Sequence, residues 1–170
     1  HRSHTSTNAI VKEIGESCIG LLIEEELKNI NKLLFKNKAP FTAILGGAKV
    51  SDKIGVIEKL IKAVDNIIIG GAMANTFIKS QGGEIGNSIY EKDKLNVADN
   101  LLKQAKEKNV NIFLPLDYVC SISINEIKRV KTYDSYNIPN NLSGYDIGEK
   151  SIKIFTNIIL ESKTIIWNGP

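Results

Sequence analysis

Two short apolar runs, each followed by a pair of glycines, constrain the fold of this chain more than any other sequence feature. Phe41–Leu45 is followed by Gly46-Gly47. Ile67–Ile69 is followed in the same way by Gly70-Gly71. Runs this short and free of charge are typical of strands buried on both faces of a parallel sheet. Amphipathic segments follow both runs. The pattern therefore predicts an α/β fold with an open, mostly parallel sheet and helices on both faces.

The spacing of apolar residues predicts the other elements. Helices are expected over about residues 17–36, 51–64, 73–79, 94–108 and 151–160, with their apolar faces in the core. Ser51 is placed near the start of the second helix, as a capping residue. Further strands are expected at Val110–Leu114 and Thr164–Trp167. The stretch from 116 to 141 has a weaker pattern, which predicts short edge strands at 119–124 and 127–133 and a turn at 137–141.

Composition is that of an ordinary globular protein, with 42% hydrophobic and 24% charged residues. A net charge of +3, from 22 basic and 19 acidic residues, is too small to favour nucleic acid as a partner. No apolar run approaches the ~20 residues that span a bilayer, and no leader opens the chain. We therefore expect no membrane partner and a cytoplasmic location. Cys18 and Cys120 are expected to be reduced core thiols rather than a disulfide or a metal site.

Both ends of the chain predict that it is a piece of a longer protein. It starts at His1 without an initiator Met, and it stops at Pro170, three residues after the end of a predicted strand. A parallel strand normally leads into a helix that covers the sheet, and no such helix follows here.

Ligands of an open parallel sheet bind at the carboxyl ends of the strands, and Gly46–Lys53 is the most telling segment at that edge. Glycines let backbone amides approach a ligand closely. Lys49 and Lys53 are four residues apart, so on a helical start they would point the same way and form a phosphate cradle. Spacing alone leaves a second interpretation equally open, in which the glycines make a tight turn and the lysines are solvated. For Gly70-Gly71, tight turning alone is the favoured interpretation.

Several other kinds of site are not supported. Neither a Walker A loop nor the dinucleotide G-x-G-x-x-G pattern occurs, which argues against a P-loop NTPase and an NAD-dependent dehydrogenase. The two histidines both lie in His1-Arg2-Ser3-His4, a cationic group that could meet an anionic substrate or could be a disordered chain end. No metal-binding cluster is visible. Asp52 and Asp117 are single carboxylates, which we expect to cap or brace loops.

Six motifs in register resemble the phosphoglycerate kinase family over essentially the whole chain, and H-R-S-H-T-S at the start resembles that family's last substrate-binding segment. The motifs are L-G-G-A-K-V-S-D-K-I at 45–54, I-I-G-G-A-M-A-N-T-F at 68–77, E-I-G-N-S at 84–88, L-P-L-D at 114–117, G-Y-D-I-G at 144–148 and I-W-N-G-P at 166–170. The resemblance implies the Rossmann-like, nucleotide-binding half of a two-domain kinase, truncated at both ends. It divides the chain into a tail of the substrate-binding domain at 1–16, an interdomain helix at 17–37 and an incomplete nucleotide-binding domain at 38–170.

The resemblance also implies an activity, which is reversible phosphoryl transfer between 1,3-bisphosphoglycerate and ADP, giving 3-phosphoglycerate and ATP. Mg²⁺ would be carried by the nucleotide, with its main protein contact outside this chain. The complete protein would be a monomer, and this chain alone would be inactive. The implied catalytic pair is Lys49 and Lys53, with Lys49 steadying the phosphoryl group in flight. The implied binding residues are Gly47, Ala48, Lys49 and Lys53 for the phosphates, Gly71 and Ala72 for the nucleoside, Gly144 for adenine, Asn168, Gly169 and Pro170 for the ribose and inner phosphate, and His1, Arg2 and His4 for 3-phosphoglycerate.

The chain departs from the family pattern at two places in the expected nucleoside site. Ala72 stands where the family usually has a third glycine, so an extra methyl group narrows the nucleoside pocket. Ile124 stands where the family carries an aromatic residue that lines the base, which leaves base stacking without an obvious partner. A non-catalytic adenine-nucleotide-binding module is the alternative interpretation. It predicts nucleotide binding without turnover.

Overall fold

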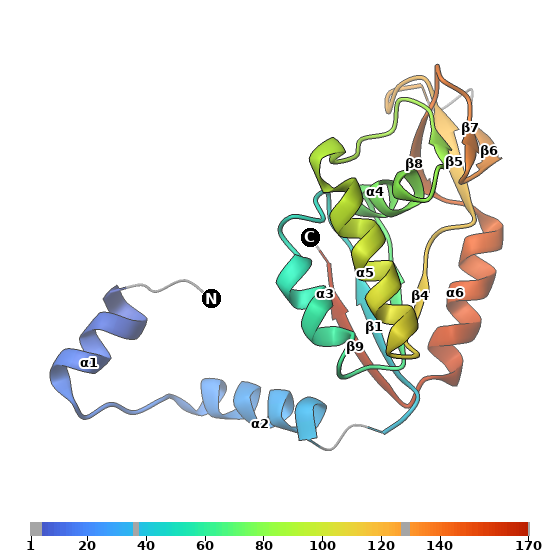
Figure 1. Cartoon of the computed structure of the whole chain (residues 1–170). Helices are drawn as coiled ribbons and strands as arrows, with labels where there is room; N and C mark the ends of the chain where they lie inside the picture. Colours follow the sequence, from blue (N-terminus) through green and yellow to red (C-terminus); the bar gives the residue numbers. More distant parts are fainter. Residues whose placement is uncertain (1–4, 36–37, 127–129, 170) are drawn as a thin grey trace. The chain divides into compact units, whose positions relative to one another are not determined.

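The computed structural model describes residues 5–35, 38–126 and 130–169 (Figure 1). The chain divides into two compact units, His1–Lys36 and Asn37–Pro170. The domain boundaries implied by the family resemblance stay predictions. No helix in the described part of the chain is long and apolar enough to cross a membrane.

The first unit is helical in its described part. A single π-helical turn, η1 (Thr5–Ala9), leads into α1 (Ile10–Ile14), and α2 spans Leu21–Phe35. The predicted helix at 17–36 thus begins four residues late, after Gly20, a residue type that disfavours a helix interior. The prediction of an apolar core face is wrong for its described side chains, because Leu21, Leu22 and Leu27 are exposed. An amphipathic helix needs a second layer to bury its apolar face, and the described part of this unit contains no sheet.

The second unit is built on a four-stranded parallel sheet in the order β4-β2-β1-β9. Its strands are β1 (Phe41–Leu45), β2 (Asn66–Ile69), β4 (Asn111–Phe113) and β9 (Thr164–Asn168). Leu45, the last residue of β1, is level with Ile69 of β2 and with Asn168 of β9. The carboxyl ends of three neighbouring strands therefore meet at one edge. The predicted α/β fold with a mostly parallel sheet is confirmed.

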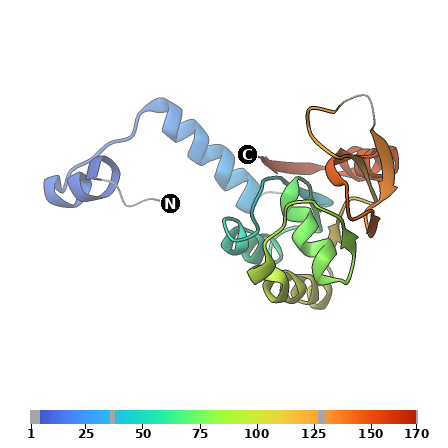
Figure 2. The same ribbon diagram turned by 90° about the horizontal axis from the view of Figure 1, so that it is seen from above.

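The connections place helices on both faces of this sheet. The helices are α3 (Ile54–Leu60), α4 (Ala72–Ser80), α5 (Leu95–Glu107, after the 3₁₀ turn η2 at Lys92–Lys94) and α6 (Glu149–Glu161). The chain moves from β1 through β2 to β4 in one direction, whereas β9 lies on the other side of β1. Because crossovers between parallel strands are right-handed, this reversal puts α6 on the face opposite α3 and α5. Figure 2 shows α3 and α5 together and α6 apart from them. The reversal also makes β1 and β9 a topological switch point, where ligands of such sheets bind.

A second, antiparallel sheet in the order β6-β5-β8 follows β4. Its strands are β5 (Asp117–Ser121), β6 (Lys131–Asp134) and β8 (Ser143–Ile147), and two-residue strands β3 (Glu84–Ile85) and β7 (Asn137–Ile138) pair beside it. The predicted strand at 119–124 is therefore displaced toward the amino terminus, and that at 127–133 partly lies outside the described residues. The predicted turn at 137–141 begins with a strand. β8 was not predicted, because S-G-Y-D-I lacks an apolar alternation.

Helix α4 joins the two sheets through a fully buried stretch, since every residue from Met73 to Ile78 is buried. Ile78 packs in a core cluster with Ile85, Tyr118 and Cys120. Cys120 is thus the core thiol that the sequence predicts, whereas Cys18 is exposed, and both are free. A helix buried all round is a rigid support, and its first residues lie at the carboxyl edge of the parallel sheet.

Candidate functional site

The two Gly-Gly turns contact each other at the carboxyl edge of the sheet. Gly71 has φ 67°, ψ −171°, a conformation essentially confined to glycine. A Cβ atom on Gly71 would lie 2.7 Å from the carbonyl oxygen of Gly47, so nothing larger fits between the turns. Met73 N–H donates to that same oxygen at 3.0 Å. Gly71 therefore does more than turn the chain: it brings the start of α4 against the loop that carries the lysines.

Lys49 and Lys53 do not lie together on a helix. Helix α3 begins at Ile54, after a turn, so the prediction that a helical start aligns the two lysines is wrong. Lys49 is exposed, and Lys53 is half-buried. The Lys53 ammonium donates to the Gly169 carbonyl oxygen at 3.3 Å and to the side-chain oxygen of Asn168. The structure thus joins Lys53 to the end of β9, across the switch point.

The loop between Gly47 and α3 is held by Glu91, which the sequence did not indicate. Glu91 Oε2 accepts the Ser51 N–H at 2.9 Å, and Oε1 accepts the Ser51 hydroxyl at 2.6 Å. Ser51 is therefore not the cap of α3 that was predicted. Burial acts to raise the pKa of the Glu91 carboxyl, but the Ser51 and Val50 hydrogen bonds and the charge of Lys49 outweigh it and lower that pKa below its usual value. Glu91 is 40 positions from Ser51, too far for a sequence pattern to link them.

A cavity of about 250 Å³ opens beside this loop. Three of the predicted nucleoside residues, Gly71, Ala72 and Gly144, line it together. The Gly144 position has no room for a side chain, because its Cβ would lie 2.9 Å from the ring of Tyr118. The other lining residues are Asn75, Ile89, Tyr118, Ser143, Tyr145, Asp146 and Ile147. The structure therefore gathers residues from the start of α4, the segment before α5 and strand β8 around one hollow.

Ile124 is not among the residues that line this cavity. It is 72% exposed and lines a separate hollow of about 100 Å³. Tyr145 lines both hollows and is 46% exposed. An aromatic ring is therefore present at the cavity, on strand β8 rather than in the loop of Ile124.

Asp117 braces the start of α6, as a single carboxylate was expected to do. The carboxylate is buried and accepts N–H groups of Lys150 at 3.1 Å and Ser151 at 2.9 Å, together with the Ser151 hydroxyl at 2.5 Å. Burial acts to raise the pKa of Asp117, but the bonds from Ser151 and Lys150 and the charge of Lys150 lower it below its usual value. Gly148 packs on this carboxylate so closely that a Cβ would lie 2.3 Å from Oδ2. Asp117 thereby anchors the end of β8, which forms one wall of the cavity.

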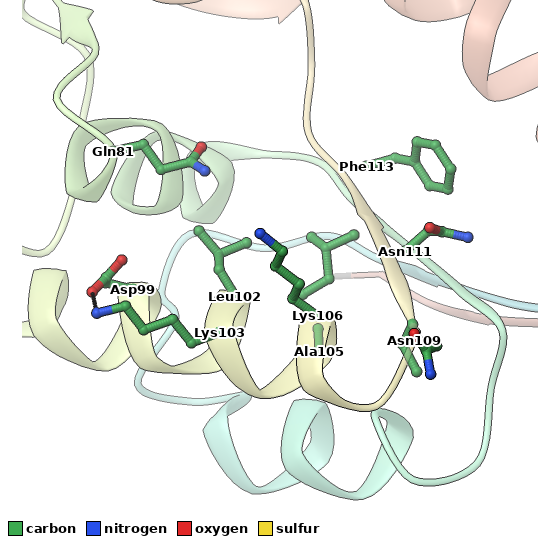
Figure 3. A pocket seen from close by; sticks show the side chains of 11 residues that line it. Gln81, Asp99, Leu102, Lys103, Ala105, Lys106, Asn109, Asn111 and Phe113 are labelled. Carbon is green, nitrogen blue, oxygen red and sulfur yellow. Dashed lines mark ion pairs between the residues drawn. The ribbon is translucent and has the colours of Figure 1, made fainter.

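A larger hollow of about 580 Å³ lies along β4 and the last turns of α5. Figure 3 shows the ion pair of Lys103 with Asp99, Lys106 on the next turn of α5, and Asn111 and Phe113 on the strand. The Lys103 Nζ and Asp99 Oδ2 atoms are 2.7 Å apart. Gln81, just after the end of α4, also lines it. It thus lies away from the start of α4 and the Gly-Gly turns, and it lacks the elements predicted to hold a nucleotide.

Four predicted site residues, His1, Arg2, His4 and Pro170, lie outside the described residues. Ala48 is exposed next to Lys49. Asn168, the last residue of β9, and Gly169, which follows the strand, both accept hydrogen bonds from Lys53. Within the described ranges, no three His, Cys, Asp or Glu side chains gather to hold a metal ion. The donors around the two turns are ammonium groups and backbone amides, which suit phosphate oxygens.

Comparison with known proteins gives one consistent result. The family model for phosphoglycerate kinase matches residues 1–170. Curated phosphoglycerate kinases of Finegoldia magna and Elusimicrobium minutum are 51% and 46% identical over the whole chain, which spans 43% and 42% of their length. The solved structure of phosphoglycerate kinase from Coxiella burnetii superposes with a TM-score of 0.86 at 35% identity, covering 90% of this chain and 39% of that one. The chain therefore belongs to the phosphoglycerate kinase family and corresponds to about two-fifths of the length of these relatives.

Proposed function

We propose that this chain is the nucleotide-binding part of a phosphoglycerate kinase, which transfers a phosphoryl group reversibly between 1,3-bisphosphoglycerate and ADP. The observation that carries this proposal is the contact between Gly47 and Gly71. It sets the lysine-bearing loop directly beside the cavity lined by Gly71, Ala72 and Gly144. A nucleotide with its base in the cavity has its phosphates at the loop.

In this proposal the phosphate site consists of Gly47, Ala48, Lys49 and Lys53. Lys53, bonded to the end of β9, holds the inner phosphates together with Asn168, Gly169 and Pro170. Lys49 is exposed, and its charge acts on the neighbouring Glu91 carboxylate without burying the ammonium group, so this ammonium can follow the phosphoryl group between donor and acceptor. Phosphoryl transfer needs positioning and charge neutralisation rather than a protein nucleophile, and two lysines with backbone amides supply both.

The remaining roles are assigned on the family relationship. His1, Arg2 and His4 are proposed to contact 3-phosphoglycerate. Mg²⁺ is proposed to arrive with ADP or ATP, where it neutralises phosphate charge. The residues near the two turns hold phosphate oxygens and supply no carboxylate cluster among the described positions. The complete protein is proposed to be a cytoplasmic monomer with no nucleic-acid or membrane partner.

The test is Lys49→Ala in the complete protein, assayed for ATP formation from 1,3-bisphosphoglycerate and ADP. We expect kcat to fall by about 10²–10³-fold, as on loss of one charge-stabilising donor, and the Kd for ADP to change much less. Lys103→Ala is the matched control, since Lys103 is a surface lysine on α5 paired with Asp99.

Two results would count against the proposal. If Lys49→Ala weakened ADP binding and left kcat unchanged, Lys49 would have no role in the transition state. If the complete protein bound ADP without turnover, the alternative of a non-catalytic nucleotide-binding module would hold. The 170-residue chain alone is expected to show no transfer.

A further inference from the structure

The segment before α5 is fixed to the buried helix α4 by two hydrogen bonds. The Ile89 carbonyl oxygen accepts the side-chain amide of Asn75 at 3.0 Å, and the Glu91 N–H donates to the Thr76 hydroxyl at 3.1 Å. Asn75 and Thr76 both lie in the stretch of α4 that is buried all round. The backbone of Glu91 therefore has a rigid support, and its side chain extends from a fixed point.

The Glu91 carboxylate connects this support to the loop that carries the two lysines. Both carboxylate oxygens bond to Ser51, one to its N–H at 2.9 Å and one to its hydroxyl at 2.6 Å. The residue before Ser51, Val50, is fully buried, and its carbonyl oxygen accepts the Lys53 N–H at 2.9 Å. The turn from Val50 to Lys53 is thus anchored in the core at its first residue and, through Glu91, on α4 at its second.

This turn separates the two lysines of the proposed phosphate site. Lys49 directly precedes the anchored residues, and Lys53 closes the turn. Because both ammonium groups are attached to this short loop, a shift of Ser51 would move them relative to the end of β9, where Lys53 bonds to Gly169. The Ser51 N–H is already bonded to a carboxylate of the protein, so it is not a donor to the phosphates.

We propose that Glu91 is a positioning residue for phosphoryl transfer, because its carboxylate fixes the turn that sets where the ammonium groups of Lys49 and Lys53 stand. This inference rests on the proposed function, since it concerns the same two lysines. Phosphoryl transfer depends on the placement of charged groups, and a displacement of about 1 Å can cost roughly 10²-fold in rate. Burial acts to raise the pKa of the Glu91 carboxyl, but its hydrogen bonds and the charge of Lys49 outweigh burial, so the group is ionised at neutral pH.

The experiment measures kcat for ATP formation and the Kd for ADP in the complete wild-type protein and in its Glu91→Ala variant. Truncation leaves Ser51 without its acceptor and releases the turn, so kcat should fall roughly tenfold, while the Kd for ADP should rise only about threefold. Formate is a small carboxylate that can enter the place vacated by the Glu91 side chain. With chloride at equal ionic strength as the reference, formate should restore most of the lost kcat in Glu91→Ala and leave the wild type unchanged.

Two further variants serve as controls. Glu91→Gln keeps a side chain in the same place but replaces one acceptor oxygen with a donor group, so kcat should fall by about threefold and formate should not restore it. Glu107→Ala removes an exposed carboxylate at the last residue of α5, and it should match the wild type with and without formate.

The outcomes separate this inference from the proposed function. Wild-type kcat in Glu91→Ala, or in Glu91→Gln should the Ala variant not fold, overturns the positioning role and leaves the proposed function intact. A loss of kcat in Glu91→Ala that formate does not relieve also overturns it, because the side chain would then support the fold without placing a carboxylate on Ser51. If the wild type transfers no phosphoryl group, the proposed function fails and this inference with it.

Discussion

The starts of α4 and α6 are built for opposite purposes. Both follow a glycine and carry no cap from their own first residue. At α6 the buried carboxylate of Asp117 accepts the free N–H groups of Lys150 and Ser151. At α4 no side-chain cap is present at Gly71, and the helix opens at the cavity. A helix start favours a negative group. Of these two helices, α6 receives such a group from the protein itself, the carboxylate of Asp117.

The difference shows how one motif serves both stability and binding. At α6 the anion is part of the fold, so the helix is fixed whether or not a ligand is present. At α4 the place for an anion lies beside Lys53 and the Gly47 turn, which the proposed function assigns to nucleotide phosphates. The first helix start holds the cavity wall in position. At the second, the Met73 N–H bonds to the Gly47 carbonyl oxygen, but no side chain caps the helix at Gly71. Substitutions at the two helix starts and on the neighbouring loop test this division.

The largest loss of stability is expected at the start of α6, where Asp117 caps the helix. Asp117→Ala removes the acceptor of two backbone N–H groups and of the Ser151 hydroxyl, all in buried surroundings. We expect the free energy of unfolding in urea at pH 7 to fall by about 3 kcal/mol, the usual cost of leaving such groups unpaired. Asp117→Asn, which keeps one acceptor oxygen, should lose less. Identical unfolding curves for Asp117→Ala and the wild type would contradict an internal cap.

The pH dependence of the Asp117 contribution has a definite sign. Its pKa is lowered in the folded protein, so the unfolded state binds the proton more readily. The contribution is therefore complete above the unfolded pKa of about 3.9 and is lost as the pH falls through the lower folded value. The stability gap between the wild type and Asp117→Asn should be constant from pH 7 to about 5 and shrink below pH ~4. A gap that widens in acid would contradict this cause.

A smaller loss of stability is expected at the start of α4, the open helix start without a side-chain cap, together with a loss of ligand binding. Gly71→Ala places a methyl group 2.7 Å from the Gly47 carbonyl oxygen and forces a positive φ on a residue with a side chain. The strain is expected to cost about 2 kcal/mol and to separate the two turns, so ADP affinity should fall in calorimetry. Gly82→Ala is the control, since Gly82 also has positive φ but meets nothing within 4 Å. If both variants bound ADP equally well, the contact between the turns would not matter for binding.

The elements that a local pattern decides were predictable from the sequence. The apolar runs at Phe41–Leu45 and Ile67–Ile69 are strands because no charge interrupts them and glycines end them. Because both Gly-Gly pairs directly follow parallel strands, the sequence also predicted that the candidate residues of these turns lie at one edge of the sheet. It also indicated that Asp117 braces a loop, although its partner Ser151, 34 positions away, cannot be read from spacing.

The errors arose where contacts distant in sequence decide the structure. Lys49 and Lys53 are off the helix because Ser51 bonds to Glu91 rather than capping α3. Strand β8 forms through pairing with β5, with a bulge between Val119 and Cys120, and not through a pattern of its own. Tyr145 was therefore not recognised as a cavity residue.

The smallest effect is expected at Glu91, which combines features of the two helix starts. Its carboxylate satisfies protein N–H and O–H groups, as Asp117 does, but it does so on the loop that serves the open site. Glu91 is only half-buried, so Glu91→Gln should lower the free energy of unfolding by about 1 kcal/mol or less. Because the pKa of Glu91 is lowered, this difference should vanish in acid as the pH falls through that value.

The effect of Glu91 on the loop can be separated from its effect on stability with Ser51→Ala, which removes the hydroxyl donor and keeps the Ser51 N–H. If the carboxylate positions the loop through this residue, Glu91→Gln and Ser51→Ala should each weaken ADP binding by about threefold, and the double variant by less than the product of the two. Independent effects would mean that the two residues act on the nucleotide separately. Tighter ADP binding in Glu91→Gln would mean that the negative charge repels the phosphates more than its hydrogen bonds order the loop. The open helix start would then be bordered by a carboxylate that limits anion affinity.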